Sequence, residues 1–243
     1  MFIFLYLTGN YHDFFQTTLH RFHNLCAISG FIQYRFFIKL KESIVYKIAL
    51  VGDSIFDNQR YVGKNQAVID HLNNKMPKTW SAKLYAQDGA MCQHIPQQVD
   101  KVSGCSHLIL SIGGNDALSY SSIVNKTVDT ISEALFHLSD IRDKFEKSYK
   151  SSLCIAKTAC NNVFICTIYD SVPNLSKDLK TALALFNERI LFIASEFDWP
   201  IIDLRVICKD SKCYSDVSVI EPSNYGGELI SSAIINAIIE SEK

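Results

Sequence analysis

The sequence lacks a strong excess of charge of either sign. Its 243 residues include 24 Lys and Arg against 25 Asp and Glu, for a net charge of -1. A surface that binds nucleic acid or an anionic membrane needs a cluster of basic residues on one face, and the sequence contains no such cluster. We therefore expect neither nucleic acid nor an anionic membrane to be the main partner.

The eight cysteines include no Cys-x-x-Cys pair, which is the spacing typical of zinc sites. A chain of this length can bury a sizeable core and does not need a disulfide framework. We therefore expect reduced, structural cysteines and neither a metal nor another cofactor. Cys208 and Cys213 are the exception, because a polar loop brings them close enough to form a disulfide in an oxidising compartment.

Long hydrophobic runs are missing as well. The opening stretch MFIFLYLTG is too short to span a bilayer, and no basic region precedes it as in a signal peptide. The sequence therefore favours a cytoplasmic protein without a firm membrane segment. Residues 1–43 are rich in aromatic side chains without a clear period, and we expect an extension outside the core, with a weak membrane anchor or a packing arm as alternatives. The compact domain is expected to span residues 44–243.

The remaining chain alternates between apolar runs and amphipathic stretches. Of all residues 48% are hydrophobic and 20% are charged, a composition typical of a globular protein. Strands are predicted at 48–51, 83–86, 108–112, 163–168 and 201–204, and helices at 66–72, 128–145, 179–197 and 229–238. Alternating strands and helices of this length predict a three-layer α/β/α sandwich around a parallel sheet.

The stretch KIALVGDSIFD, residues 47–57, places a serine at the end of a predicted strand. The continuous apolar run 48–51 is typical of a strand covered on both faces. Gly52 allows a sharp turn, so Asp53 and Ser54 lie at the carboxyl end of the strand, where open α/β sheets bind their ligands. Ser54 is therefore a candidate nucleophile, although Asp-Ser at such a position also serves ordinary turns and helix caps.

A second polar group follows another predicted strand. The sequence GGND, residues 113–116, comes directly after the strand 108–112 and so shares a rim of the sheet with Ser54. Gly89, in the loop QDGAM, offers a backbone N–H that no side chain blocks. An ester hydrolase needs donors for the oxyanion, and the Ser54 N–H, the Gly89 N–H and the Asn115 amide would supply three. Taken singly, each of these residues also fits a simple turn.

Taken together and in this order, GDS at 52–54, Gly89 and GGND at 113–116 resemble the SGNH, or GDSL-type, serine hydrolases. The resemblance covers roughly residue 47 to the C-terminus. It implies a flavodoxin-like α/β/α fold and metal-free hydrolysis of a small-molecule ester, often an acetyl or acyl ester of a lipid or sugar, through a serine acyl-enzyme. It also implies that Ser54 is the nucleophile and that Gly89 and Asn115 are oxyanion donors.

The C-terminal block departs from the pattern of that family. Where the family carries an aspartate and, three residues later, a histidine, this chain has Ser218 and Glu221, and its last histidine is His137. Asp216 is the nearest other carboxylate. A carboxylate with a pKa of about 4.3 is a poorer base than imidazole. Two interpretations therefore stay open: an ester hydrolase with Glu221 or Asp216 as an unusual acid–base partner, and a hydrolase fold that has lost catalysis and binds an acylated ligand or a protein partner.

Overall fold

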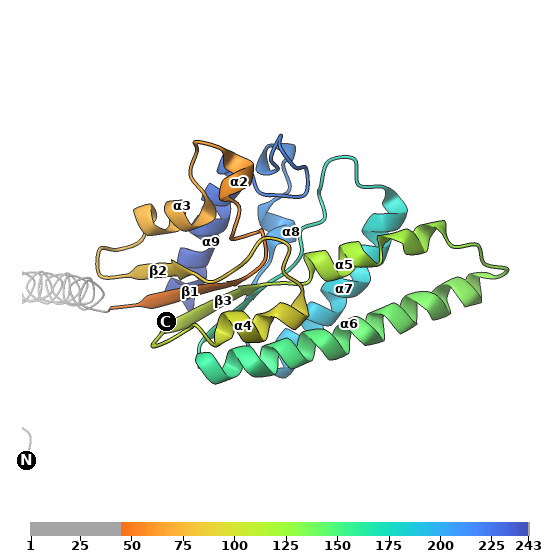
Figure 1. The fold of residues 1–243 in the computed structure, drawn as a ribbon, viewed down its shortest axis with the longest axis horizontal. Helices are drawn as coiled ribbons and strands as arrows, with labels where there is room; N and C mark the ends of the chain where they lie inside the picture. Colours follow the sequence, from red (N-terminus) through yellow and green to blue (C-terminus); the bar gives the residue numbers. More distant parts are fainter. Residues whose placement is uncertain (1–44, 243) are drawn as a thin grey trace, which may run out of the picture. The chain divides into compact units, whose positions relative to one another are not determined.

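Five parallel strands form the sheet at the centre of the structure (Figure 1). The computed structural model describes residues 45–242, so the predicted extension 1–43 lies outside the described residues. The strands are β1 (Lys47–Gly52), β2 (Ser81–Leu84), β3 (His107–Ser111), β4 (Val163–Cys166) and β5 (Ile201–Ile202). Their order is β2-β1-β3-β4-β5, with every neighbouring pair parallel. This is the flavodoxin-like order, whose topological switch point lies between β1 and β3.

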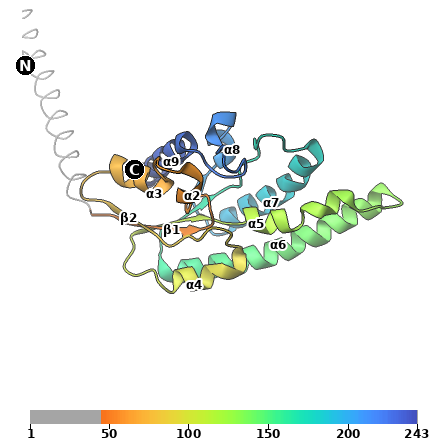
Figure 2. The ribbon, with the colours of Figure 1, turned by 45° about the horizontal axis from the view of Figure 1, so that its top comes forward.

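Helices cover both faces of this sheet. They are α2 (Gln59–Val62), α3 (Val68–Lys75), α4 (Ile95–Val99), α5 (Gly114–Ser119), α6 (Ile131–Ala159), α7 (Lys177–Glu196), α8 (Leu204–Ile207) and α9 (Asn224–Ser241), with short 3₁₀ turns η1 (Cys92–His94), η2 (Ser121–Asn125) and η3 (Ser211–Cys213). Figures 1 and 2 show α4 and α6 on one face and α3 and α9 on the other. The predicted three-layer sandwich is confirmed.

The strands contribute side chains to two separate apolar cores, because neighbouring side chains of a strand point to opposite faces of the sheet. Val51 and Leu110 pack with the side chains of α4, α6 and α7. Leu50 and Ile109 pack with those of α3 and α9. All four are fully buried, which explains why the strands read as continuous apolar runs rather than as an alternating pattern.

The C-terminal helix begins earlier than the sequence pattern indicates. The pattern predicts a helix at 229–238, whereas α9 begins at Asn224, with Gly226 and Gly227 in its first turn. The Ser223 hydroxyl caps this turn by accepting the Gly226 N–H at 3.0 Å. A Cβ atom at Gly226 would lie 2.2 Å from the carbonyl oxygen of Cys213. The glycine therefore allows α9 to approach the preceding loop closely.

The apolar stripe of α6 also differs from its prediction. The helix begins at Ile131, so Val128 lies outside it. Ile131 and Leu135 are 81% and 61% exposed, whereas Phe145 in the same stripe is buried. Figure 1 shows the reason: the N-terminal half of α6 extends past the end of the sheet. Its first apolar residues have no sheet to cover.

The helix predicted to end at residue 145 continues to Ala159. Other boundaries moved by a few residues, with β2 at 81–84 rather than 83–86 and α3 at 68–75 rather than 66–72. Cys208 and Cys213 are both free and buried. Within residues 45–242 no helix is long and apolar enough to cross a membrane.

Candidate active site

The turn after β1 brings Ser54 to the switch point between β1 and β3. Gly52 has a φ angle of 138°, a region that favours glycine. A Cβ atom there would lie 1.8 Å from the carbonyl oxygen of Ser111 at the end of β3, so no other residue type fits. The next N–H, of Asp53, donates to that same oxygen at 3.1 Å. The rim of β3 therefore fixes the turn that presents Ser54.

A buried glutamine holds the same turn from the other side. The Gln98 carboxamide accepts the Gly52 N–H at 2.8 Å and donates to the Gly52 carbonyl oxygen at 2.7 Å. Gln98 lies in α4 and is fully buried. Since buried backbone groups need partners, this side chain replaces the pairing that the strand loses where it turns away.

The structure brings Ser54 and Glu221 together. The Ser54 hydroxyl donates to Glu221 Oε1 at 2.9 Å. Both side chains are buried, with exposed fractions of 6% for Ser54 and 5% for Glu221. A carboxylate oxygen thus contacts the candidate nucleophile directly, at the distance that a general base requires.

Hydrogen bonds to its neighbours and its own backbone fix the position of Glu221. The Tyr169 hydroxyl donates to the carbonyl oxygen of Ile220, and the Asn58 amide donates to that of Pro222 at 3.1 Å. The Glu221 carbonyl accepts the Ser215 N–H at 2.8 Å. The loop therefore presents the carboxyl from a rigid backbone.

Burial sets the proton affinity of this site. Desolvation raises the pKa of Glu221 to about 7, against the opposing effect of the Ser54 hydrogen bond. It also raises the pKa of Asp53 to about 8, with smaller contributions from the charges of Glu221 and Asp116. Glu221 Oε2 is buried and has no hydrogen-bond partner among the described residues. At neutral pH Glu221 is therefore divided between its protonated and ionised forms.

Asn115 lies at the same rim, in the first turn of α5. Its amide donates to the carbonyl oxygen of Ala90 at 3.0 Å. A carboxamide has two N–H donors, and the second makes no bond within the described residues. Asn115 lines the cavity beside Ser54, so its side chain borders the space that a ligand would occupy.

Gly89 lies near this group but is exposed and is not among the residues that line the cavity. Its φ angle of 75° again favours glycine. The loop is attached to the β1 turn, because the Asp88 N–H donates to Asp57 Oδ2 at 2.9 Å. The expected contribution of the Gly89 N–H to an oxyanion pocket stays a prediction.

The other candidate base lies apart from the serine. Asp216 is exposed, and within residues 45–242 it makes no hydrogen bond to Ser54 or Glu221. The carbonyl oxygen of Ser218 accepts the Glu221 N–H at 3.0 Å, so Ser218 shapes the loop through its backbone. No histidine is among the residues that line the cavity, and in the described part of the chain no group of three His, Cys, Asp or Glu side chains is placed to hold a metal ion.

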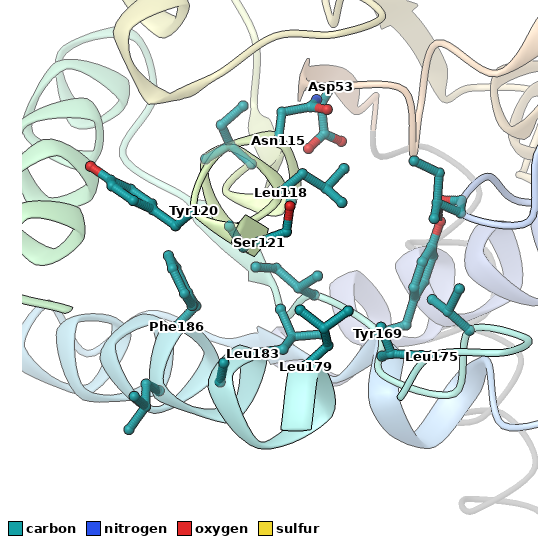
Figure 3. Close-up of a pocket in the computed structure, with 18 of the residues that line it drawn as sticks. Asp53, Asn115, Leu118, Tyr120, Ser121, Tyr169, Leu175, Leu179, Leu183 and Phe186 are labelled. Atoms are coloured by element: carbon teal, nitrogen blue, oxygen red, sulfur yellow. Dashed lines mark hydrogen bonds between the residues drawn. The ribbon is translucent and has the colours of Figure 1, made fainter. Parts of the chain in front are cut away.

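An apolar cavity of about 140 Å³ opens beside Ser54 (Figure 3). Asp53, Ser54, Asn115 and Glu221 form its polar end. Aliphatic and aromatic side chains from α5, η2, α6, α7 and the loop after β4 form most of the remaining wall. Figure 3 labels Leu118, Tyr120, Tyr169, Leu175, Leu179, Leu183 and Phe186 among them.

The side chains that hold the rim in place were not predicted from the sequence. Asn187 in α7 accepts the Ile168 N–H and donates to the Ile168 carbonyl oxygen, both at 2.8 Å, in the same manner as Gln98. Asn58 accepts the Val68 N–H at 3.0 Å in addition to its bond to the Glu221 loop. A polar residue on an otherwise apolar helix face was the available signal for Gln98 and Asn187. No sequence signal identified their partners.

These features define the class of fold: a flavodoxin-like α/β/α sandwich with a buried serine–carboxylate pair at its switch point. Solved structures of esterases and lipases have the same fold.

An acetyl xylan esterase from Geobacillus stearothermophilus matches with a TM-score of 0.57 at 14% identity, over 79% of this chain and 94% of that one. A member of the lipolytic G-D-S-L family from Veillonella parvula matches with a TM-score of 0.57 at 16% identity, over 78% and 96%. An extracellular lipase from Streptomyces rimosus matches with a TM-score of 0.57 at 13% identity, over 81% and 99%. No protein-family model and no curated protein matches the sequence. Identities this low establish the shared fold alone.

Proposed function

We propose that this protein is a carboxylic ester hydrolase in which Ser54 is the nucleophile and Glu221 is its general base. The observation that carries the proposal is the 2.9 Å hydrogen bond from Ser54 Oγ to Glu221 Oε1. A hydroxyl is a weak nucleophile until a positioned base accepts its proton. A pKa of about 7 makes Glu221 a stronger base than an exposed glutamate.

In the acylation step, Ser54 Oγ attacks the ester carbonyl carbon while its proton passes to Glu221 Oε1. The bond between that carbon and the alcohol oxygen then breaks, and Glu221 returns the proton to the departing alkoxide. The acyl group is left on Ser54, and Glu221 is again ionised.

Deacylation repeats these transfers with water. Glu221 accepts a proton from the water, the resulting hydroxide attacks the acyl carbon, and the proton returns to Ser54 Oγ as the carboxylic acid leaves. In both steps the negative charge on the former carbonyl oxygen needs donors. The Asn115 amide and the Ser54 N–H are proposed for this role, with the Gly89 N–H as the third donor that the family resemblance implies.

The alternative is a binding protein with a hydrolase fold, and one observation favours it. Glu221 occupies the place of the family histidine, and its Oε2 atom is buried without a hydrogen-bond partner among the described residues. No orienting group therefore supports this carboxyl as an aspartate supports an imidazole. In this alternative the serine and the cavity bind an acylated ligand without turning it over.

Covalent labelling by a fluorophosphonate probe distinguishes the two. We expect the wild type to label, Ser54→Ala to lose labelling, and Ser122→Ala, a change at an exposed serine of η2, to label as the wild type does. A folded wild type that fails to label from about pH 5 to 9 contradicts the enzyme proposal. Labelling that appears only in the double variant Ser218→Asp/Glu221→His would identify Glu221 as a disabling substitution.

A further inference from the structure

The cavity beside Ser54 is mostly apolar away from its serine end. Asp53, Asn115 and Glu221 lie with Ser54 at this end, and Tyr120 and Ser121 add a hydroxyl each elsewhere on the wall. Elsewhere on the wall, Arg142 is already paired, since its guanidinium donates to Asp143 Oδ1 at 2.7 Å. A sugar or a charged alcohol would therefore find few hydrogen-bond partners along most of the wall.

The apolar wall is incompletely covered by the protein itself. Leu175, Leu179 and Leu183 are neither fully buried nor fully exposed, and Figure 3 shows them facing the cavity together with Phe186. Pockets with mostly hydrophobic walls and a few polar groups at one end are typical small-molecule sites. An apolar chain entering this cavity would remove their surface from water.

The cavity also limits the length of such a chain. Its volume of about 140 Å³ is close to that of an apolar cavity of roughly 150 Å³ that accommodates benzene, with six carbon atoms, in another protein. A chain of about six carbons therefore fills it, whereas an acetyl group would leave most of the wall uncovered.

We infer that this cavity binds the acyl chain of the ester and that the enzyme prefers acyl chains of about six carbons to acetyl. The inference rests on the proposed function, because it places the carbonyl carbon at Ser54 and the chain along the wall formed by α5, η2, α6 and α7. The alcohol then leaves toward the open side of the rim.

Chain-length dependence of hydrolysis is the first test. For p-nitrophenyl esters we expect kcat/KM to rise roughly twofold to fourfold for each added methylene from acetate to hexanoate, the factor that burial of a methylene supplies, and then to level or fall. Equal kcat/KM values for acetate and hexanoate would overturn the inference.

Two alanines of α7 give a matched pair of variants. Ala182 lines the cavity, whereas Ala184 is exposed on the same helix. We expect Ala182→Phe to lower the ratio of hexanoate to acetate kcat/KM at least tenfold and Ala184→Phe to leave it unchanged. Leu183→Ala enlarges the cavity and should move the preferred chain to greater length. An unchanged preference in both Ala182→Phe and Leu183→Ala would contradict the assignment.

Binding without turnover separates this inference from the proposed function. Calorimetric titration of Ser54→Ala with 3-octanone, in which a methylene replaces the ester oxygen of methyl hexanoate, should show binding. Adding Ala182→Phe should abolish that binding, and adding Ala184→Phe should retain it. Ketone binding in a wild type without hydrolytic activity would refute the proposed function and keep the cavity assignment. Hydrolysis without any dependence on chain length would support the proposed function and refute the cavity assignment.

Discussion

At the residue scale, burial has two opposing effects on Glu221. It raises the pKa to about 7, which makes the carboxylate a stronger base, and it lowers the fraction that is ionised at neutral pH. A general base works best with a pKa near the operating pH, where both factors are substantial. In the proposed mechanism, the surroundings of Glu221 thus partly compensate for the absence of an imidazole at this position.

The same burial makes Glu221 a source of pH-dependent instability. A carboxyl whose pKa is raised by folding stabilises the folded protein at pH values below its pKa in the unfolded chain, which is near 4.5. This stabilisation is lost as the pH rises through about 7. Glu221→Gln removes the ionisation and keeps the shape. We expect the variant to be more stable than the wild type by roughly 1–2 kcal/mol at about pH 8.5 and nearly equal at about pH 5.

Denaturant unfolding at both pH values measures this difference. Asp53 also has a raised pKa and is present in both proteins, and the smaller contribution of the Glu221 charge to that pKa is part of the measured difference. A difference of the same size at both pH values would show that Glu221 does not titrate as inferred.

Asn115 provides a second test at the residue scale. Loss of one oxyanion donor typically lowers kcat by roughly a hundredfold to a thousandfold, and we expect that loss in Asn115→Ala, measured with a short-chain aryl ester. Asn125→Ala, at an exposed asparagine of η2, is the control. Unchanged turnover in a folded Asn115→Ala variant would remove Asn115 from the site.

At the scale of elements, the rim loops depend on buried carboxamides. Gln98 holds the peptide groups of Gly52 at the end of β1, and Asn187 holds those of Ile168 after β4. Each carboxamide matches one donor and one acceptor of a backbone that has just left the sheet. The loops that present Ser54 and Tyr169 are thereby attached to α4 and α7.

We expect Gln98→Leu to lower the free energy of unfolding by about 2–4 kcal/mol, because it leaves the buried Gly52 N–H without its acceptor and the Gly52 carbonyl with one fewer donor. Gln97→Leu changes the exposed neighbour and should stay within about 0.5 kcal/mol of the wild type. Chemical denaturation measures both. Equal stabilities of the two variants would show that the carboxamide does not support the turn.

At this scale it is clearest which features the sequence predicts and which it does not. Apolar runs predicted the strands because side chains on both faces of the sheet must be apolar, and the strand ends predicted the rim where Ser54 and Asn115 line one cavity. The attachment of Gln98 to Gly52 could not be predicted, since it joins residues 46 positions apart through groups that have no sequence period. The exposed start of α6 was also unpredictable, because helical spacing does not reveal where the sheet ends.

Glu221 is the part of the site where sequence and structure complement each other. The family resemblance located it as the replacement of a histidine, but two carboxylates, Glu221 and Asp216, stayed open as the partner of the serine. The geometry brings Glu221 to Ser54 and leaves Asp216 exposed. The conformation of the loop decides between Glu221 and Asp216, and the spacing of residues in the sequence does not determine that conformation.

At the scale of the whole molecule, the five-stranded sheet and both of its helical layers lie within residues 45–242. We therefore propose that the chain without residues 1–41 folds by itself and melts in one cooperative transition. Thermal unfolding followed by circular dichroism, beside the full chain, measures this. A truncated chain that fails to fold, or that loses much of its cooperative transition, would show that the aromatic residues of the N-terminal segment belong to the core.

The central claim is that Glu221 takes the proton from Ser54, and the pH dependence of fluorophosphonate labelling tests it most directly. The rate constant for the wild type should rise with pH through a single apparent pKa near 7 and then level, because only ionised Glu221 accepts the proton. Glu221→Gln should label about a hundredfold or more slowly at the plateau, without that inflection. Equal rate constants for the wild type and Glu221→Gln across the pH range would contradict the claim and assign the proton to another group.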